Sequence, residues 1–217
     1  RISHRTCQVP EFSLEFVYIR SVSKRYQKNL RIQPSPMIPS VQQCFALMTQ
    51  YEMLENIKAH SIVVERIASL IARGLQEAGE HLSLDRVTAG ALMHDIAKTR
   101  SLRTKENHSA TGSEICLENH LEEIADIVAE HVVLKAFSRE GPVLEKEIVY
   151  YADKRVNHDK IVSLEERLAY LIKQYGNGDE TLILRMGKNF DLCKQVESKL
   201  FSKLRFAPED VASMLRL

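Results

Sequence analysis

Cysteine is scarce in this sequence, and its four occurrences are far apart. Cys7, Cys44, Cys116 and Cys193 form no Cys-x-x-Cys pair, so neither a disulfide framework nor a zinc knuckle is expected. No apolar run approaches the length of about 18 residues that a membrane helix needs. The first thirty residues also lack the charged start, apolar stretch and cleavage site of a secretory signal. We therefore expect reduced thiols in a cytoplasmic protein without a membrane span.

Charge of one sign is not in excess either, because the net charge is only +1. The distribution is uneven: residues 1–36 hold seven Lys or Arg side chains against two Glu, whereas acidic residues outnumber basic ones in the remainder. Pro34, Pro36 and Pro39 separate the two parts. We interpret residues 1–39 as a basic, peripheral leader. Binding of RNA or DNA by this leader is the alternative that we favour less.

The alternation of apolar and polar residues that is typical of β-strands is nearly absent after residue 40. Helical spacing dominates instead, first in residues 41–57 and again in residues 60–75. Ser83 can cap a further helix that runs to about Thr99. The only candidate strand is FSLEFVYI at residues 12–19. We therefore expect an all-α single domain of about seven to nine helices, arranged as a bundle.

The sequence GNGD at residues 176–179 interrupts the helical pattern. We place the main helical domain at residues 40–176 and a C-terminal helical extension at residues 177–217. Apolar residues in this extension follow helical spacing. We expect it to cover the core, with the surface of a homodimer as the alternative, and to supply no metal ligand.

Several ionisable residues fall on helix faces that should be buried. Four separate stretches each place such residues on an apolar stripe: His60, His94 with Asp95, His131 and Asp153. Burial of carboxylates and imidazoles without partners costs several kcal/mol, and a shared divalent cation would remove this cost. Nitrogen and oxygen donors suit Fe, Mn, Zn, Co or Ni better than Ca. His108, at the start of a predicted helix, is a further candidate ligand.

The dipeptide His-Asp occurs twice, and the surroundings distinguish the two pairs. His94-Asp95 follows the small and apolar residues AGALM inside a helix that must pack. His158-Asp159 lies among polar and charged residues near a helix end. We therefore interpret the first pair as part of a buried site and the second as closer to the surface.

The order His, His-Asp, His, His, Asp resembles the HD-domain superfamily of metal-dependent phosphohydrolases. The contexts LMHDIAK at 92–98 and YYADK at 150–154 carry the resemblance, which covers roughly residues 41–176. Residues 151–167 also resemble a block that recurs in a bacterial group of such proteins. The Gly after HDI and the GYP motif of the branch that hydrolyses cyclic dinucleotides are absent, so that branch is not favoured.

The resemblance implies a site with one or two divalent metal ions, among Fe, Mn, Co, Ni, Zn and Mg. The implied ligands of the first metal are His60, His94, Asp95 and Asp153. Branches with two metals add histidines at positions that match His108 and His131, and they use the Asp95-type carboxylate as a bridge. Lys98 would contact a substrate phosphate, while Arg155 and His158 would lie at the pocket mouth and bind a phosphate or a base.

The implied activity is hydrolysis of a phosphoester or phosphoanhydride by metal-activated water, with Asp95 and Lys98 as catalytic residues. We expect a phosphorylated small molecule as substrate, and a nucleotide in particular. Dinucleoside tetraphosphates are the first candidates and nucleoside monophosphates the next. Two other classes stay open: a di-iron oxygenase of the same fold, and a non-catalytic module that senses nucleotides.

Overall fold

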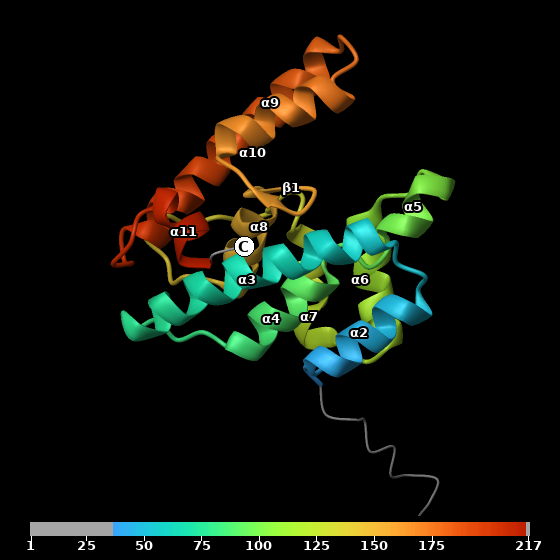
Figure 1. Ribbon diagram of the computed structural model, residues 1–217, viewed down its shortest axis with the longest axis horizontal. Coiled ribbons are helices and arrows are strands. Elements are labelled where there is room, and N and C mark those ends of the chain that lie inside the picture. The colour runs from blue at the N-terminus through green and yellow to red at the C-terminus, as the bar shows by residue number, and fades with distance from the viewer. Residues whose placement is uncertain (1–36, 216–217) are drawn as a thin grey trace, which may run out of the picture. The chain divides into compact units, whose positions relative to one another are not determined.

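The computed structural model describes residues 37–215, which fold almost entirely into helices (Figure 1). In chain order the α-helices are α2 (Val41–Gln50), α3 (Glu55–Glu77), α4 (Leu84–Met93), α5 (Lys98–Thr104), α6 (His108–Glu118), α7 (Glu122–Glu130), α8 (Glu145–Asp153), α9 (Leu164–Tyr175), α10 (Glu180–Phe201) and α11 (Val211–Leu215). A short 3-10 helix, Pro208–Asp210, precedes α11. Within the described range, the only strands are β1 (Val156–Asn157) and β2 (Lys160–Ile161), which pair antiparallel. The expected all-α class is confirmed, while the leader up to residue 36 and its candidate strand lie outside the described residues.

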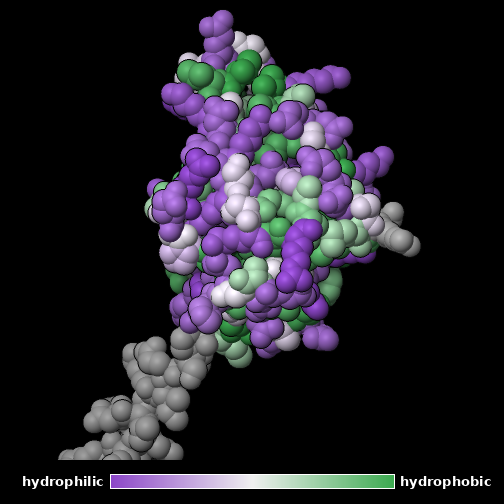
Figure 2. Space-filling view, turned by 90° about the vertical axis from the view of Figure 1, so that its left-hand side faces the viewer, coloured by the Kyte–Doolittle hydropathy of each residue, from purple (hydrophilic) through white to green (hydrophobic). Residues whose placement is uncertain are grey.

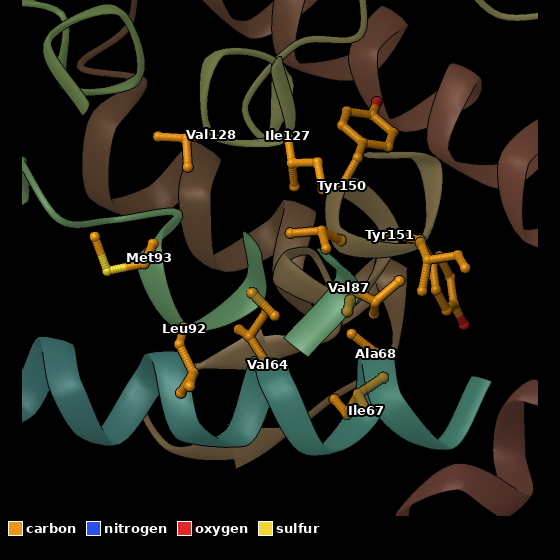
Figure 3. Packing of buried hydrophobic residues seen from close by; sticks show 14 of the residues in the cluster. Val64, Ile67, Ala68, Val87, Leu92, Met93, Ile127, Val128, Tyr150 and Tyr151 are labelled. Atoms are coloured by element: carbon orange, nitrogen blue, oxygen red, sulfur yellow. The ribbon is translucent and has the colours of Figure 1, made fainter. Parts of the chain in front are cut away.

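The hydrophobic core is built on α3, which packs against α4 and α8, while α4 also packs against α7. Figure 3 shows side chains of all four helices meeting in one interior, among them Val64, Val87, Ile127 and Tyr150. All four of these residues are fully buried. Burial of this apolar surface is the main source of the stability that holds the four helices in place.

The ends of the core helices position the polar residues that the sequence singles out. His94 directly follows α4, His131 directly follows α7, and Asp153 is the last residue of α8. His60 lies near the start of α3, and His108 is the first residue of α6. Because these helices pack on one another, their ends bring residues together that are up to 93 positions apart in the sequence.

Two glycines allow the helices next to these residues to approach closely. A Cβ atom on Gly90 of α4 would lie 2.7 Å from the Ile127 side chain of α7. A Cβ atom on Gly112 of α6 would lie 2.8 Å from the Val128 side chain, also of α7. Both separations are far inside van der Waals contact. Because these two glycines have no side chain, α4 and α6 can pack close to α7, the helix that precedes His131.

The helix predicted from Ser83 to about Thr99 begins as expected, since the Ser83 hydroxyl accepts a hydrogen bond from the Arg86 amide. It does not continue to Thr99, because a tight turn at residues 94–97 separates α4 from α5. In this turn the Ile96 amide donates to the Met93 carbonyl over 3.0 Å. Consecutive residues of an α-helix point about 100° apart, so the turn is what lets two neighbours, His94 and Asp95, reach one site.

The first predicted helix also ends early, because α2 stops at Gln50 and α3 starts at Glu55. Glu52 between them has a positive φ of 52°, which an α-helix does not accommodate. The Leu54 amide, at the start of α3, donates to the Thr99 hydroxyl over 3.0 Å. This contact joins the start of α3, where His60 lies, to the start of α5.

The C-terminal helices α9 and α10 lie side by side and extend away from α3 and α4 (Figure 1). The second half of α10 packs on α8 through four buried residues: Phe190, Cys193, Val196 and Leu200. At the far end of the pair, Tyr175 and Leu184 are 51% and 59% exposed, and apolar side chains gather at the top of the molecule in Figure 2. Of the helices in residues 37–215, none is long and apolar enough to cross a membrane.

Candidate metal centre

The first cluster of donor atoms joins α3, the turn after α4 and the end of α8. His60 Nε2 lies 3.1 Å from Asp153 Oδ1, and His94 Nε2 lies 3.7 Å from the same oxygen. His94 Nε2 is also 3.6 Å from Asp95 Oδ2. One donor atom each of His60, His94 and Asp95 lies within 4.8 Å of the other two. Two imidazole nitrogens and two carboxylates thus face a common point, a set that suits a divalent cation.

A second cluster lies on the other side of Asp95. Its Oδ1 atom is 3.2 Å from His108 Nε2 and 3.5 Å from His131 Nε2. The two imidazole nitrogens are 3.2 Å apart. Asp95 therefore directs one oxygen toward each cluster, and its carboxylate would supply a ligand to a divalent cation in either of them.

The backbone fixes which nitrogen three of these histidines present to the site. Nδ1 of His60 is 2.8 Å from the His158 carbonyl, and Nδ1 of His94 is 2.7 Å from the Ala91 carbonyl. Nδ1 of His131 is 2.7 Å from the Val128 carbonyl. Because a carbonyl oxygen only accepts, each Nδ1 carries the proton and donates it. Nε2 is then the atom available to a metal, and such backbone contacts orient metal-bound histidines in general.

The Nε2 atom of His94 carries the clearest sign of a metal ligand. It is buried and has no hydrogen-bond partner among the described residues, although an unsatisfied buried polar atom costs about 1–3 kcal/mol. Burial lowers the pKa of His94 to about 4, so the imidazole is neutral at neutral pH. A neutral imidazole with a free lone pair that points at two carboxylates fits a metal ion at this position.

The pKa values of both carboxylates of the site are held low. Burial raises the pKa of Asp95, but nearby Lys98 and the surrounding histidines outweigh burial and hold this pKa well below its usual value. The pKa of Asp153 is likewise held low despite burial, chiefly by the hydrogen bond with His60. Two negative charges that are largely withdrawn from water require compensation, and a divalent cation held by both carboxylates would provide it.

Lys98, the first residue of α5, lies at the edge of the second cluster. Its Nζ is 3.4 Å from Asp95 Oδ1 and 3.4 Å from His108 Nε2. The side chain is 35% exposed, so the ammonium group can meet a ligand that enters from solvent. Contact of this ammonium group with a substrate phosphate stays a prediction.

The other two residues expected at the pocket mouth lie in different surroundings. Arg155 is buried and does not reach the cluster: its guanidinium donates to the carbonyls of Val162 and Pro208 and to the Tyr151 hydroxyl. The structure thus gives Arg155 a role in holding the C-terminal segment. His158 lies in the turn between β1 and β2, with a positive φ of 54°, and its exposed side chain does line the pocket beside the cluster.

This pocket has a volume of about 370 Å³ and adjoins the donor atoms. It is lined by His60, Asp95, Lys98 and His158, by Asn56, Ile57 and Leu102, and by four residues of α9: Arg167, Tyr170, Leu171 and Tyr175. The four α9 residues are not among the candidate site residues predicted from the sequence. Arg167 lies three residues after Leu164 and four before Leu171, so helical spacing places it on the apolar stripe of its helix. This spacing does not show that the helix lies over the metal centre.

Comparison with known proteins agrees with this geometry. The family model of the HD domain matches residues 57–157, a range that holds all six candidate ligands. Residues 57–157 are an HD domain. HD domains are generally metal-dependent hydrolases, and the buried His/Asp clusters of this one suit divalent metal binding.

Two relatives match most of the length of this chain. An uncharacterized protein of Methanocaldococcus jannaschii is 24% identical over 155 residues, which are 65% of this chain and 84% of the relative. A tRNA (cytidine(56)-2'-O)-methyltransferase of Picrophilus torridus is 26% identical over 179 residues, which are 73% of this chain. The chain spans only 49% of that enzyme. No solved structure matches the chain significantly.

Proposed function

We propose that this HD domain is a two-metal phosphohydrolase that cleaves a phosphoester or phosphoanhydride bond of a nucleotide. The observation that carries the proposal is the position of Asp95. One of its oxygens faces His94 at 3.6 Å, and the other faces His108 and His131 at 3.2 Å and 3.5 Å. The site therefore offers two neighbouring positions for divalent ions that share one carboxylate.

Each residue of the site has a distinct role in this proposal. The first ion would be held by His60, His94, Asp95 and Asp153, and the second by Asp95, His108 and His131. Bound divalent ions supply an activated water and counter charge on phosphate oxygens. Lys98 would place its ammonium group against a non-bridging oxygen of the phosphate. The backbone carbonyls that accept from Nδ1 keep the ligand atoms aimed at the centre while substrate binds.

The charge of the pocket favours a phosphate substrate over the substrates of an oxygenase. Lys98 lies at the cluster, and Arg167 lines the same pocket, so a ligand in this pocket would meet an ammonium and a guanidinium group. A nucleotide-sensing module would share these contacts but would not turn its ligand over. The second relative is named as an enzyme that methylates tRNA, but this chain spans only 49% of it. Neither methyl transfer nor a tRNA substrate is therefore part of the proposal.

The test is a hydrolysis screen with metal-free protein that is reconstituted separately with Mn, Co, Fe, Zn, Ni and Mg. The substrates are nucleoside mono-, di- and triphosphates and dinucleoside polyphosphates. We expect phosphate release with at least one metal, and loss of turnover by more than about a hundredfold in Asp95→Asn. Asp159→Asn, which alters the exposed acid of the second His-Asp pair, is the matched control and keeps full activity. Oxygen uptake with iron, without phosphate release, would favour the oxygenase instead.

A further inference from the structure

The wall of the pocket that faces the metal centre comes from α9. This helix contributes Arg167, Tyr170, Leu171 and Tyr175. The opposite wall contains His60, Asp95 and Lys98. A ligand that reaches the metal centre through this pocket therefore also meets α9, which supplies none of the candidate metal ligands.

Arg167 on this wall has hydrogen-bonding capacity that the protein does not use. Its Nη1 donates to the Asn157 side-chain oxygen over 2.8 Å. Its Nε is buried and has no partner within the described part of the chain, and no carboxylate of that part forms an ion pair with it. A buried guanidinium donor without an acceptor is costly. An anionic group of a ligand is the partner that the fork of an arginine fits best.

Arg155, which lies between α8 and β1, has a purely structural role and serves for comparison. Its Nε and both terminal nitrogens donate to protein acceptors, and Glu197 lies 3.7 Å from its guanidinium. Among the described residues, Arg167 has one nitrogen without a hydrogen-bond partner and no acid that forms an ion pair with it. Arg167 thus differs from Arg155 in keeping a donor that the described residues do not use, which favours a ligand-binding role over a role in packing alone.

The turn between β1 and β2 fixes the α9 wall relative to the metal centre. The His158 carbonyl accepts from Nδ1 of His60 over 2.8 Å. The His158 ring packs edge-on against Tyr170 at 5.4 Å, and its Nε2 is 3.2 Å from the Tyr170 hydroxyl. One residue therefore contacts both a candidate metal ligand and α9, so the spacing between the two walls is defined before a ligand enters.

We infer that Arg167 binds an anionic group of the substrate other than the phosphate that is cleaved. The substrate class is then a nucleotide with at least two phosphate groups. The cleaved phosphate lies at the metals beside Lys98, and a second phosphate pairs with Arg167. The nucleoside contacts the apolar part of the pocket, which Ile57, Leu102, Leu171 and Tyr175 form. This inference rests on the proposed phosphohydrolase function.

The test measures binding separately from turnover, with metal-loaded protein and α,β-methylene ADP as a probe that resists hydrolysis. Titration calorimetry compares the affinity for α,β-methylene ADP with that for AMP. The same comparison is made with the corresponding guanine nucleotides. We expect Arg167→Gln to weaken binding of the diphosphate analogue by about ten- to a hundredfold while AMP binding changes much less. Arg167→Lys restores part of the affinity, since charge remains but the fork is lost. Arg185→Gln, on an exposed position of α10, makes the same charge change and alters neither affinity.

Hydrolysis of p-nitrophenyl phosphate, which has a single phosphate and no base, reports on the metal centre alone. We expect kcat/KM for this substrate to match the wild type in Arg185→Gln. Metal content and melting temperature should stay unchanged in Arg167→Gln, which shows that its metal centre and fold are intact. Equal loss of affinity for AMP and the diphosphate analogue, or no loss for either, would overturn the inference. Arg167-dependent binding of the analogue without hydrolysis of any phosphate compound would uphold the inference and contradict the proposed enzyme. Cleavage of p-nitrophenyl phosphate without Arg167-dependent binding of the analogue would uphold the proposed enzyme and contradict the inference.

Discussion

The ion pair between Glu147 of α8 and Lys199 of α10 attaches the C-terminal helix to the HD domain. We expect its loss to lower the free energy of unfolding markedly. Lys199 Nζ lies 2.9 Å and 2.8 Å from the two Glu147 oxygens and 2.9 Å from the Pro142 carbonyl. The two side chains are only 2% and 1% exposed. Lys199→Met keeps most of the side-chain volume but leaves the Glu147 carboxylate buried without its counter-charge. Removal of one partner from such a pair costs about 3–5 kcal/mol.

Urea unfolding in the presence of a chelator measures this change without a contribution from metal binding. Lys194→Met on the same helix is the matched control, because its pair with Glu165 has side chains that are 51% and 69% exposed. An exposed pair contributes about 0–1 kcal/mol. In the double variant Lys199→Met/Glu147→Gln we expect recovery of at least half of the loss, since a Gln at 147 can still accept from the Leu144 amide.

Metal content per folded chain provides a second readout for the same variants. We expect Lys199→Met to bind metal as the wild type does, because α10 supplies no candidate ligand. If Lys199→Met destabilises the fold no more than Lys194→Met does, the reasoning about the buried pair is wrong. If it lowers metal content while the fold stays intact, α10 contributes to the site in a way that the geometry does not indicate.

Two further predictions concern the helix contacts and the lysine of the site. Gly90→Ala should destabilise the fold by about 1–3 kcal/mol, because the new Cβ would lie 2.7 Å from the buried Ile127 side chain. Gly187→Ala in α10 meets nothing within 4 Å and should stabilise the fold by about 0.5–1 kcal/mol; equal thermal shifts for both variants would contradict this contrast. Lys98→Met should lower kcat/KM by about a hundredfold or more while metal content stays unchanged, and wild-type rates with the metal-loaded variant would remove Lys98 from the mechanism.

The candidate ligands could be found in the sequence because two simple patterns meet at them. Apolar spacing identifies the buried face of each helix, and a charged or imidazole side chain on that face needs a partner. His60, His94 and His131 stand out by this criterion, and the structure places all three in the buried clusters. The criterion needs only local periodicity, so it does not depend on knowing how the helices are arranged.

The rest of the pocket depends on where the chain turns, which local periodicity does not reveal. The two-residue strands and the positive φ of His158 reverse the chain after α8. This reversal brings α9, with Arg167 and Tyr170, over the metal centre. Arg155, just before β1, instead donates to the Pro208 carbonyl of the 3-10 helix. The sequence does not predict the turn after Met93 either, because the spacing of apolar residues in 84–99 is that of one continuous helix. Both features arise from long-range packing rather than from the preference of the local sequence.

The central claim is that Asp95 is shared by two metal ions, and a count of bound metal tests it most directly. Titration of metal-free protein with Mn²⁺, followed by calorimetry and by elemental analysis after gel filtration, gives the number of ions per chain. We predict two ions for the wild type and one for His131→Ala, which removes a ligand of the second cluster only. Asp95→Asn should lose high-affinity binding at both positions, and Asp159→Asn should keep two ions. A wild-type protein that binds one ion or none, or an Asp95→Asn protein that binds two, would contradict the account.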